Sequence, residues 1–172
     1  RTDSSAASDV YKRQVFNEVF FTDVKIPETN IVGKRGEGWA VANATLGHER
    51  GSLAPPDAIM NRVNMLIDLM KEEKLDGKPL IEHPIYRDRL MKIQGKVMAS
   101  QSHALRLLSA KLNPGQDVKV GKMIQKLVGT ELRHELEGLA IDVMGEIGVL
   151  YEDSPHLRDK GSWQFIYMYF LG

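Results

Sequence analysis

The sequence predicts an all-α fold, an up-down four-helix bundle preceded by a short β-strand segment. Three observations support this prediction: long stretches with apolar residues every three or four positions, short connections marked by proline and glycine, and one early segment rich in valine and phenylalanine. The chain has 172 residues, 42% of them hydrophobic and 27% charged, which is typical of a folded protein.

The N-terminal part contains two different segments. Residues 4–14 read SSAASDVYKRQ, which matches the translation of a common sequencing-library adapter, so we expect residues 1–14 to be non-native. Residues 15–26 read VFNEVFFTDVKI and predict a strand, and the linker that follows contains one proline and three glycines. A lone strand cannot stabilise itself, so we expect its partners upstream or on another chain. We therefore assign residues 15–36 to the end of a β-domain and residues 37–172 to a helical domain, and we expect truncation at both ends.

The first two helical stretches are separated by prolines. Apolar spacing predicts a helix from Trp39 that ends at Pro55 and Pro56, because proline lacks the backbone donor. Asp57 can restart the helix, which continues to a charged turn at residues 71–78.

Three further helices follow. Pro84 opens a helix that Asn113, Pro114 and Gly115 end. We predict the last helix from His156 to Gly172, because Ser154 and Pro155 form a suitable N-cap and first turn. The helix between them carries the longest apolar stripe: Val120, Ile124, Leu127, Val128, Leu132, Leu136, Leu139, Ala140 and Val143.

Composition excludes several classes of function. Basic and acidic residues both number 23, so the chain lacks the basic surplus that would indicate a nucleic acid as partner. There is no cysteine, which excludes disulfides and thiolate metal sites and suits a reducing compartment. The longest apolar run, Phe165–Leu171, is far shorter than the roughly 20 residues that a membrane-spanning helix needs, so we expect no membrane partner.

Three polar motifs are candidates for chemistry. Glu131 and His134 have the spacing of a ligand pair in di-iron bundles, but no second Glu-x-x-His is present, so we predict no metal site. Glu49 and Arg50 follow the small residues Thr45 and Gly47: burial would make Glu49 a general base, whereas exposure would leave a surface ion pair. The segment Gly145-Glu146-Ile147-Gly148 fits either close backbone approach to a phosphate or a helix C-cap.

Several of these segments together resemble one enzyme family. Residues 17–30, NEVFFTDVKIPETN, with Gly38-Trp39, are similar to the acyl-CoA dehydrogenase signature where the middle β-domain passes into the C-terminal helical bundle. Further matches are residues 46–50, 121–132 and 139–145, so the resemblance covers residues 15–172. It implies an FAD enzyme that oxidises an acyl-CoA thioester to the 2-enoyl-CoA and passes electrons to an electron-transfer flavoprotein. It also implies a homo- or hetero-oligomer in a bacterial cytoplasm or a mitochondrial matrix.

The resemblance assigns roles to four residues. Glu49 matches the catalytic base of members that carry it in a Glu-Arg pair on the first bundle helix; other members place the base in a loop that would follow Gly172. Arg50 would shape the substrate pocket, and Gly145 and Gly148 match a cofactor-binding loop. Two departures leave room for a catalytically silent partner subunit: residues 71–78 replace an Arg-x-x-Phe-Gly segment, and the glycine-rich loop is reduced.

Overall fold

The computed structural model describes residues 19–52, 55–113, 118–150 and 154–169, without the side chains of residues 48–52. The chain divides into two compact units, residues 1–44 and 45–172. The predicted all-α class is confirmed, because helices make up nearly all of the regular structure that is described. The helices are α1 (Gly38–Ser52), α2 (Pro56–Glu72), α3 (Pro84–Leu112), α4 (Lys119–Met144) and α5 (Ser162–Tyr169).

In the first unit, the expected strand does not form over the residues that are described. Val19 is an isolated bridge residue, and residues 20–26 have no regular structure. A short 3-10 helix, Glu28–Asn30, follows, and α1 begins at Gly38. The prediction was wrong here because a β-strand needs a neighbouring strand to receive its hydrogen bonds, and residues 20–52 supply none.

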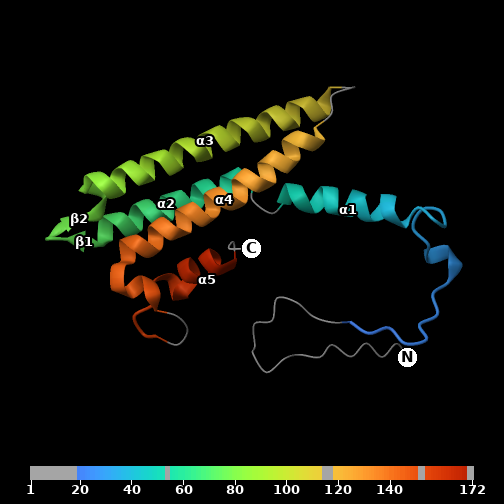
Figure 1. Ribbon diagram of the computed structural model, residues 1–172, viewed down its shortest axis with the longest axis horizontal. Helices are drawn as coiled ribbons and strands as arrows, with labels where there is room; N and C mark the ends of the chain where they lie inside the picture. Colours follow the sequence, from blue (N-terminus) through green and yellow to red (C-terminus); the bar gives the residue numbers. More distant parts are fainter. Residues whose placement is uncertain (1–18, 53–54, 114–117, 151–153, 170–172) are drawn as a thin grey trace. The chain divides into compact units, whose positions relative to one another are not determined.

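The second unit is a helical bundle in which α2, α3, α4 and α5 pack together (Figure 1). Ion pairs show that α3 and α4 are antiparallel, since Arg89 pairs with Asp142 and Lys96 with Glu135. The core consists of apolar residues spaced three or four apart on these helices, as the sequence predicts. Its most deeply buried members are Ile59, Val63, Leu66, Met70, Val97, Leu136, Leu139, Ala140 and Trp163.

A small hairpin connects α2 to α3. The charged turn predicted at residues 71–78 contains two short antiparallel strands, β1 (Lys74–Leu75) and β2 (Lys78–Pro79). Asp76 and Gly77 have φ angles of +51° and +79°, which are typical of the two central residues of a type I′ turn. The Asp-Gly pair therefore folds the chain back on itself and allows α3 to run antiparallel to α2.

Only the C-terminal half of the α4 stripe is buried. Leu136 has no exposed surface, whereas Val120 is 65% and Leu127 59% exposed. Arg62 of α2 pairs with Glu137 of α4, and these two helices run in the same direction. The first residue of α2, six positions before Arg62, therefore lies beside Glu131, six positions before Glu137. The N-terminal half of α4 extends past this level, which explains why its apolar residues are not covered.

The last helix starts later than predicted. Ser154 Oγ accepts a hydrogen bond from the backbone N–H of His156, but this contact belongs to a turn. Asp159 and Lys160 have positive φ angles, which prevents a helix from continuing through them. The helix α5 begins at Ser162, and Trp163 Nε1 donates a hydrogen bond to Asp159 Oδ2 at 2.6 Å.

Candidate functional site

The predicted base and its neighbour lie on α1. Glu49 and Arg50 are in the last turn of this helix, which ends at Ser52, shortly before Pro55. The expectation that the chain is helical here is confirmed. Their side chains lie outside the described part of the structure, so their roles stay predictions.

The two predicted cofactor-binding glycines lie together at the C-terminal end of α4. Gly145 has φ +57° and ψ −127°, a conformation that other residues adopt only with strain, and a Cβ atom there would meet nothing within 4 Å. Gly148 has the opposite limitation: a Cβ atom would collide with the carbonyl oxygen of Ile141. Both positions therefore require glycine for backbone reasons, one for its dihedral angles and the other for close packing.

A mainly apolar hollow of about 390 Å³ lies beside Gly148, between α4, the 3-10 helix Gly145–Val149 and α5. Tyr167 and Gln164 contribute its polar groups. Gln164 is only 5% exposed; its Nε2 donates to the carbonyl oxygen of Ile147 at 3.4 Å, and its Oε1 has no hydrogen-bond partner in the described part of the chain. A hollow of this size suits one ring system rather than a whole dinucleotide.

A buried cluster of charged residues was missed by the sequence analysis. Arg62 donates to both carboxylate oxygens of Glu137, at 2.9 Å from Nε and 2.8 Å from Nη2. The guanidinium carbon lies 3.4 Å from the ring centroid of Trp163, and Nη1 donates to Ser162 Oγ at 3.3 Å. Arg133 Nε is 3.9 Å from the same carboxylate. The cluster therefore joins α2, α4 and α5.

Burial controls the electrostatics of this cluster. It raises the pKa of Glu137 above its usual value, although the hydrogen bonds and charge of Arg62 and the charge of Arg133 oppose the shift. Burial also lowers the pKa of Arg133, against the attraction of Glu137. Because Glu137 has no exposed surface, a ligand cannot touch it, and we assign the cluster a structural role.

The cluster had a signal in the sequence. Arg62 lies three residues after Ile59 and four before Leu66, so it shares their core-facing side of α2. Arg133, the third charged member of the cluster, has a side chain that is only 17% exposed.

Glu131 and His134, which have the spacing of a metal-ligand pair, lie in different surroundings from those of a metal site. The His134 ring stacks on Tyr167, with 4.3 Å between ring centroids, and Glu131 is exposed. Among the residues that the structure describes, no group of three or more histidine, aspartate or glutamate side chains is placed to hold a metal ion.

Comparison with known proteins identifies the family. The family described as "Acyl-CoA dehydrogenase, C-terminal domain" matches residues 36–164, from just before α1 into α5. The chain therefore belongs to the acyl-CoA dehydrogenase family, as the resemblance in the sequence implied.

Individual relatives agree with this assignment. Acyl-CoA dehydrogenase IpdE1 of Mycobacterium tuberculosis is 32% identical over 158 residues, which are 90% of this chain and 37% of that protein. Glutaryl-CoA dehydrogenase of Desulfococcus multivorans is 30% identical over 111 residues, 61% of this chain and 28% of that protein. The chain thus spans well under half the length of these relatives.

Solved structures share the fold. The ChsE4-ChsE5 complex from Mycobacterium tuberculosis has a TM-score of 0.77 at 22% identity, covering 98% of this chain and 43% of that chain. Butyryl-CoA dehydrogenase from Megasphaera elsdenii has a TM-score of 0.70 at 22% identity, covering 90% of this chain and 40% of that chain.

Proposed function

We propose that this chain supplies the C-terminal helical domain of an FAD-dependent acyl-CoA dehydrogenase, which converts an acyl-CoA thioester into the 2-enoyl-CoA. The observation that carries the proposal is the family match over residues 36–164, which includes α1 and its Glu-Arg pair. Residues 15–36 are then the end of the middle β-domain.

In this proposal Glu49 removes the proton from the α-carbon of the thioester. The α-proton is acidic because the developing negative charge is shared with the thioester carbonyl, and a carboxylate is a suitable base. Arg50, the next residue, holds the substrate and keeps a positive charge close to the carboxylate. When bound, FAD supplies the acceptor for the hydride that leaves the β-carbon.

The hollow beside Gly148 supports a role for this end of α4 in holding FAD. A Cβ atom at Gly145 would meet only open space, so no side chain there stands between the backbone and a ligand, and the mainly apolar hollow beside Gly148 has room for one ring system. We therefore keep Gly145 and Gly148 as cofactor-binding residues.

The wider setting follows from the family. We infer an electron-transfer flavoprotein as the electron acceptor and an oligomeric enzyme; one structural neighbour is a complex of two differently named chains. A bacterial cytoplasm or a mitochondrial matrix is the compartment that we infer, since the relatives include bacterial proteins and three named as mitochondrial.

The test is to express this chain with its flanking coding sequence and compare Glu49→Gln with the unchanged enzyme. We expect kcat to fall about 10³-fold with FAD content and acyl-CoA binding retained, because general-base catalysis contributes about 10²–10⁴-fold. Glu131→Gln, an exposed carboxylate on α4, is the matched control and should keep full activity. Unchanged kcat in Glu49→Gln would move the base to another residue, and no activity in either enzyme would favour the silent partner subunit.

A further inference from the structure

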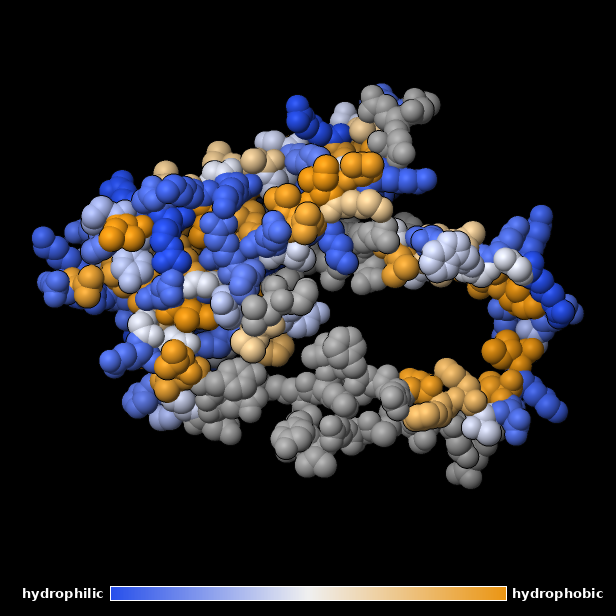
Figure 2. All heavy atoms as spheres, viewed as in Figure 1, coloured by the Kyte–Doolittle hydropathy of each residue, from blue (hydrophilic) through white to orange (hydrophobic). Residues whose placement is uncertain are grey.

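Arg62 and Glu137 are buried, unlike most charged residues of the bundle. In Figure 2 the visible face of the bundle is mainly hydrophilic, with hydrophobic side chains in separate groups. The side chains of Arg62 and Glu137 lie beneath such a surface, at 7% and 0% exposure. An apolar pair of similar volume stabilises a fold about as well as a buried ion pair does. Stability alone therefore does not explain charges in this place, and the geometry of the pair supplies another reason.

Arg62 lies where three helices meet. Its forked guanidinium group makes three hydrogen bonds to Glu137 of α4. The same group lies over the ring of Trp163 and donates to Ser162 Oγ, and both of these residues belong to the first turn of α5. A planar group with several donors imposes a direction on its partners, which apolar packing does not. Arg62 therefore fixes the start of α5 against α2 and α4.

The helix α5 depends on such contacts because it is short. It has eight residues, and isolated helices of fewer than about 12 residues are marginal. Its last turn is held by a second contact, the stack of Tyr167 on His134 of α4. Trp163 and Tyr167 are four positions apart, so they share one face of the helix. Side chains of α2 and α4 thus set both the position of α5 and its rotation about its own axis.

The same helix forms one wall of the hollow beside Gly148. The residues that line the hollow from α5 are Gln164, Tyr167 and Met168. Gln164 directly follows Trp163, about 100° further round the helix, so a rotation of α5 at Trp163 would move the lining side chains by the same angle. Arg62 is not among the described residues that line the hollow, so it acts on the hollow through α5.

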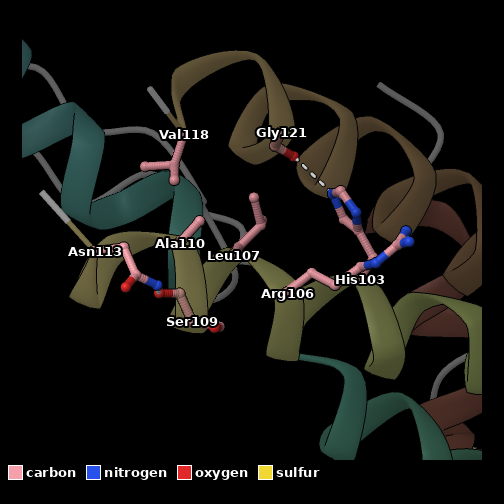
Figure 3. Close-up of a pocket in the computed structure, with 8 residues that line it drawn as sticks. All are labelled: His103, Arg106, Leu107, Ser109, Ala110, Asn113, Val118 and Gly121. Atoms are coloured by element: carbon pink, nitrogen blue, oxygen red, sulfur yellow. Dashed lines mark hydrogen bonds between the residues drawn. The ribbon is translucent and has the colours of Figure 1, made fainter. Parts of the chain in front are cut away.

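A second hollow of the bundle is held together differently. It measures about 440 Å³ and lies between α3 and α4 (Figure 3). The His103 ring faces the carbonyl oxygen of Gly121, 3.1 Å from Nε2, so residues that line this hollow also join its two helices. At the hollow beside Gly148, the contacts of Arg62 with the first turn of α5 lie outside the lining. A residue that touches no ligand can therefore control the shape of that hollow.

We propose that Arg62 is a positioning residue for the flavin cofactor. Through Trp163 and Ser162 it fixes α5, so that the hollow beside Gly148 keeps the shape that accepts one ring system of FAD. The inference rests on the proposed function, because it takes this hollow as part of the FAD site. The bundle itself already encloses Arg62, and any further chain of the full enzyme can only cover it more.

The experiment compares Arg62→Met with the unchanged enzyme, both expressed with the flanking coding sequence. FAD is removed, and its Kd is measured by titrating it back and following the flavin fluorescence. Residues that orient the ligands of a metal site from outside change its affinity about 10–100-fold when they are replaced, and we expect FAD binding to weaken near the lower limit of this range, about tenfold. The amides of α5 should also exchange hydrogen faster in Arg62→Met before FAD is added, because the helix has lost its anchor.

Two variants separate positioning from stability. Ile93→Ala leaves a cavity in the core at α3, which contributes none of the described residues that line the hollow, so the melting temperature should fall while the Kd for FAD stays unchanged. Arg62→Met/Glu137→Met leaves no buried carboxylate without its main partner, so it should be more stable than Arg62→Met and yet bind FAD equally weakly. An equal rise of the Kd in Ile93→Ala, or recovery of FAD binding in the double variant, would overturn the proposal.

A further variant tests whether the effect passes through the hollow. Val149 lines the hollow and is 80% exposed, so Val149→Trp fills the space without disturbing the core and should also weaken FAD binding. Weaker binding in Arg62→Met but not in Val149→Trp would overturn the link to this hollow. If the unchanged enzyme binds no FAD, the proposed function fails and this inference fails with it. If the unchanged enzyme binds FAD and Arg62→Met binds it equally well, this inference alone is wrong.

Discussion

Replacing Arg62 by methionine tests the buried cluster that joins α2, α4 and α5. Methionine keeps a long apolar side chain next to Trp163 but removes the charge and all three hydrogen bonds to Glu137. Glu137 has no exposed surface, so its charge would remain buried without its main partner. Removing one member of a buried ion pair costs about 3–5 kcal/mol of folding stability.

The structure places the expected loss near the lower limit of that range. Arg133 lies 3.9 Å from the Glu137 carboxylate and still supplies a positive charge. We therefore expect a loss of about 3 kcal/mol, which lowers the melting temperature by about 6–12 °C in a chain of this length. Urea unfolding and thermal unfolding, each followed by circular dichroism, measure the two quantities.

A double-mutant cycle separates the ion pair from simple packing. Glu137→Met alone leaves two arginines facing each other and should also cost about 3 kcal/mol. Arg62→Met/Glu137→Met leaves no unpaired buried carboxylate and should lose only about 1–2 kcal/mol, because buried ion pairs are replaced by apolar residues at little cost. If the double variant loses as much as the two single variants together, the residues are not coupled and the reasoning is wrong.

Two further predictions follow from the same region. Because burial raises the pKa of Glu137, the folded chain binds this proton at higher pH than the unfolded chain, so the free energy of unfolding should fall as pH rises between the two pKa values. Urea unfolding over a pH series should show this fall relative to Glu137→Gln, and parallel curves for the two proteins would contradict it. Gly148→Ala should cost more stability than Gly145→Ala, because the new Cβ atom at position 148 would meet the backbone of Ile141. At position 145 the new Cβ atom would meet only open space, and the substitution costs about 1–3 kcal/mol of backbone strain. Equal losses on urea unfolding would show that the backbone at Gly148 moves to make room.

Most of the helical architecture could be predicted from local signals. Pro56 at the first position of α2 and Pro84 at the first position of α3 mark where these helices begin, because proline needs no hydrogen-bond partner there. The expected start at His156 failed because Asp159 and Lys160 adopt positive φ angles, which the helix-start signals in the sequence do not reveal.

The candidate site was only partly accessible from the sequence. The motif of Gly145 and Gly148 was found, but the reason for each glycine was not, since one depends on a dihedral angle and the other on the distance to Ile141. The pairing of Arg62 with Glu137 joins residues 75 positions apart, and spacing along one helix does not show which charged residue of another helix will meet it. The orphaned oxygen of Gln164 likewise becomes visible only when α5 is packed against α4.

The net charge of the whole chain differs from the charge of one part of its folded surface. The formal net charge is zero, and this value argued against a nucleic acid as partner. Yet residues 89–130 contain eight basic residues and one acidic residue, so the opposite imbalance is spread over the rest of the chain. A partner responds to charges within about one Debye length, about 8 Å at physiological salt, and not to the sum over the sequence. The helices bring Arg106, Lys122 and Lys126 to one end of the bundle beside exposed leucine and isoleucine, and the total charge does not show this local imbalance.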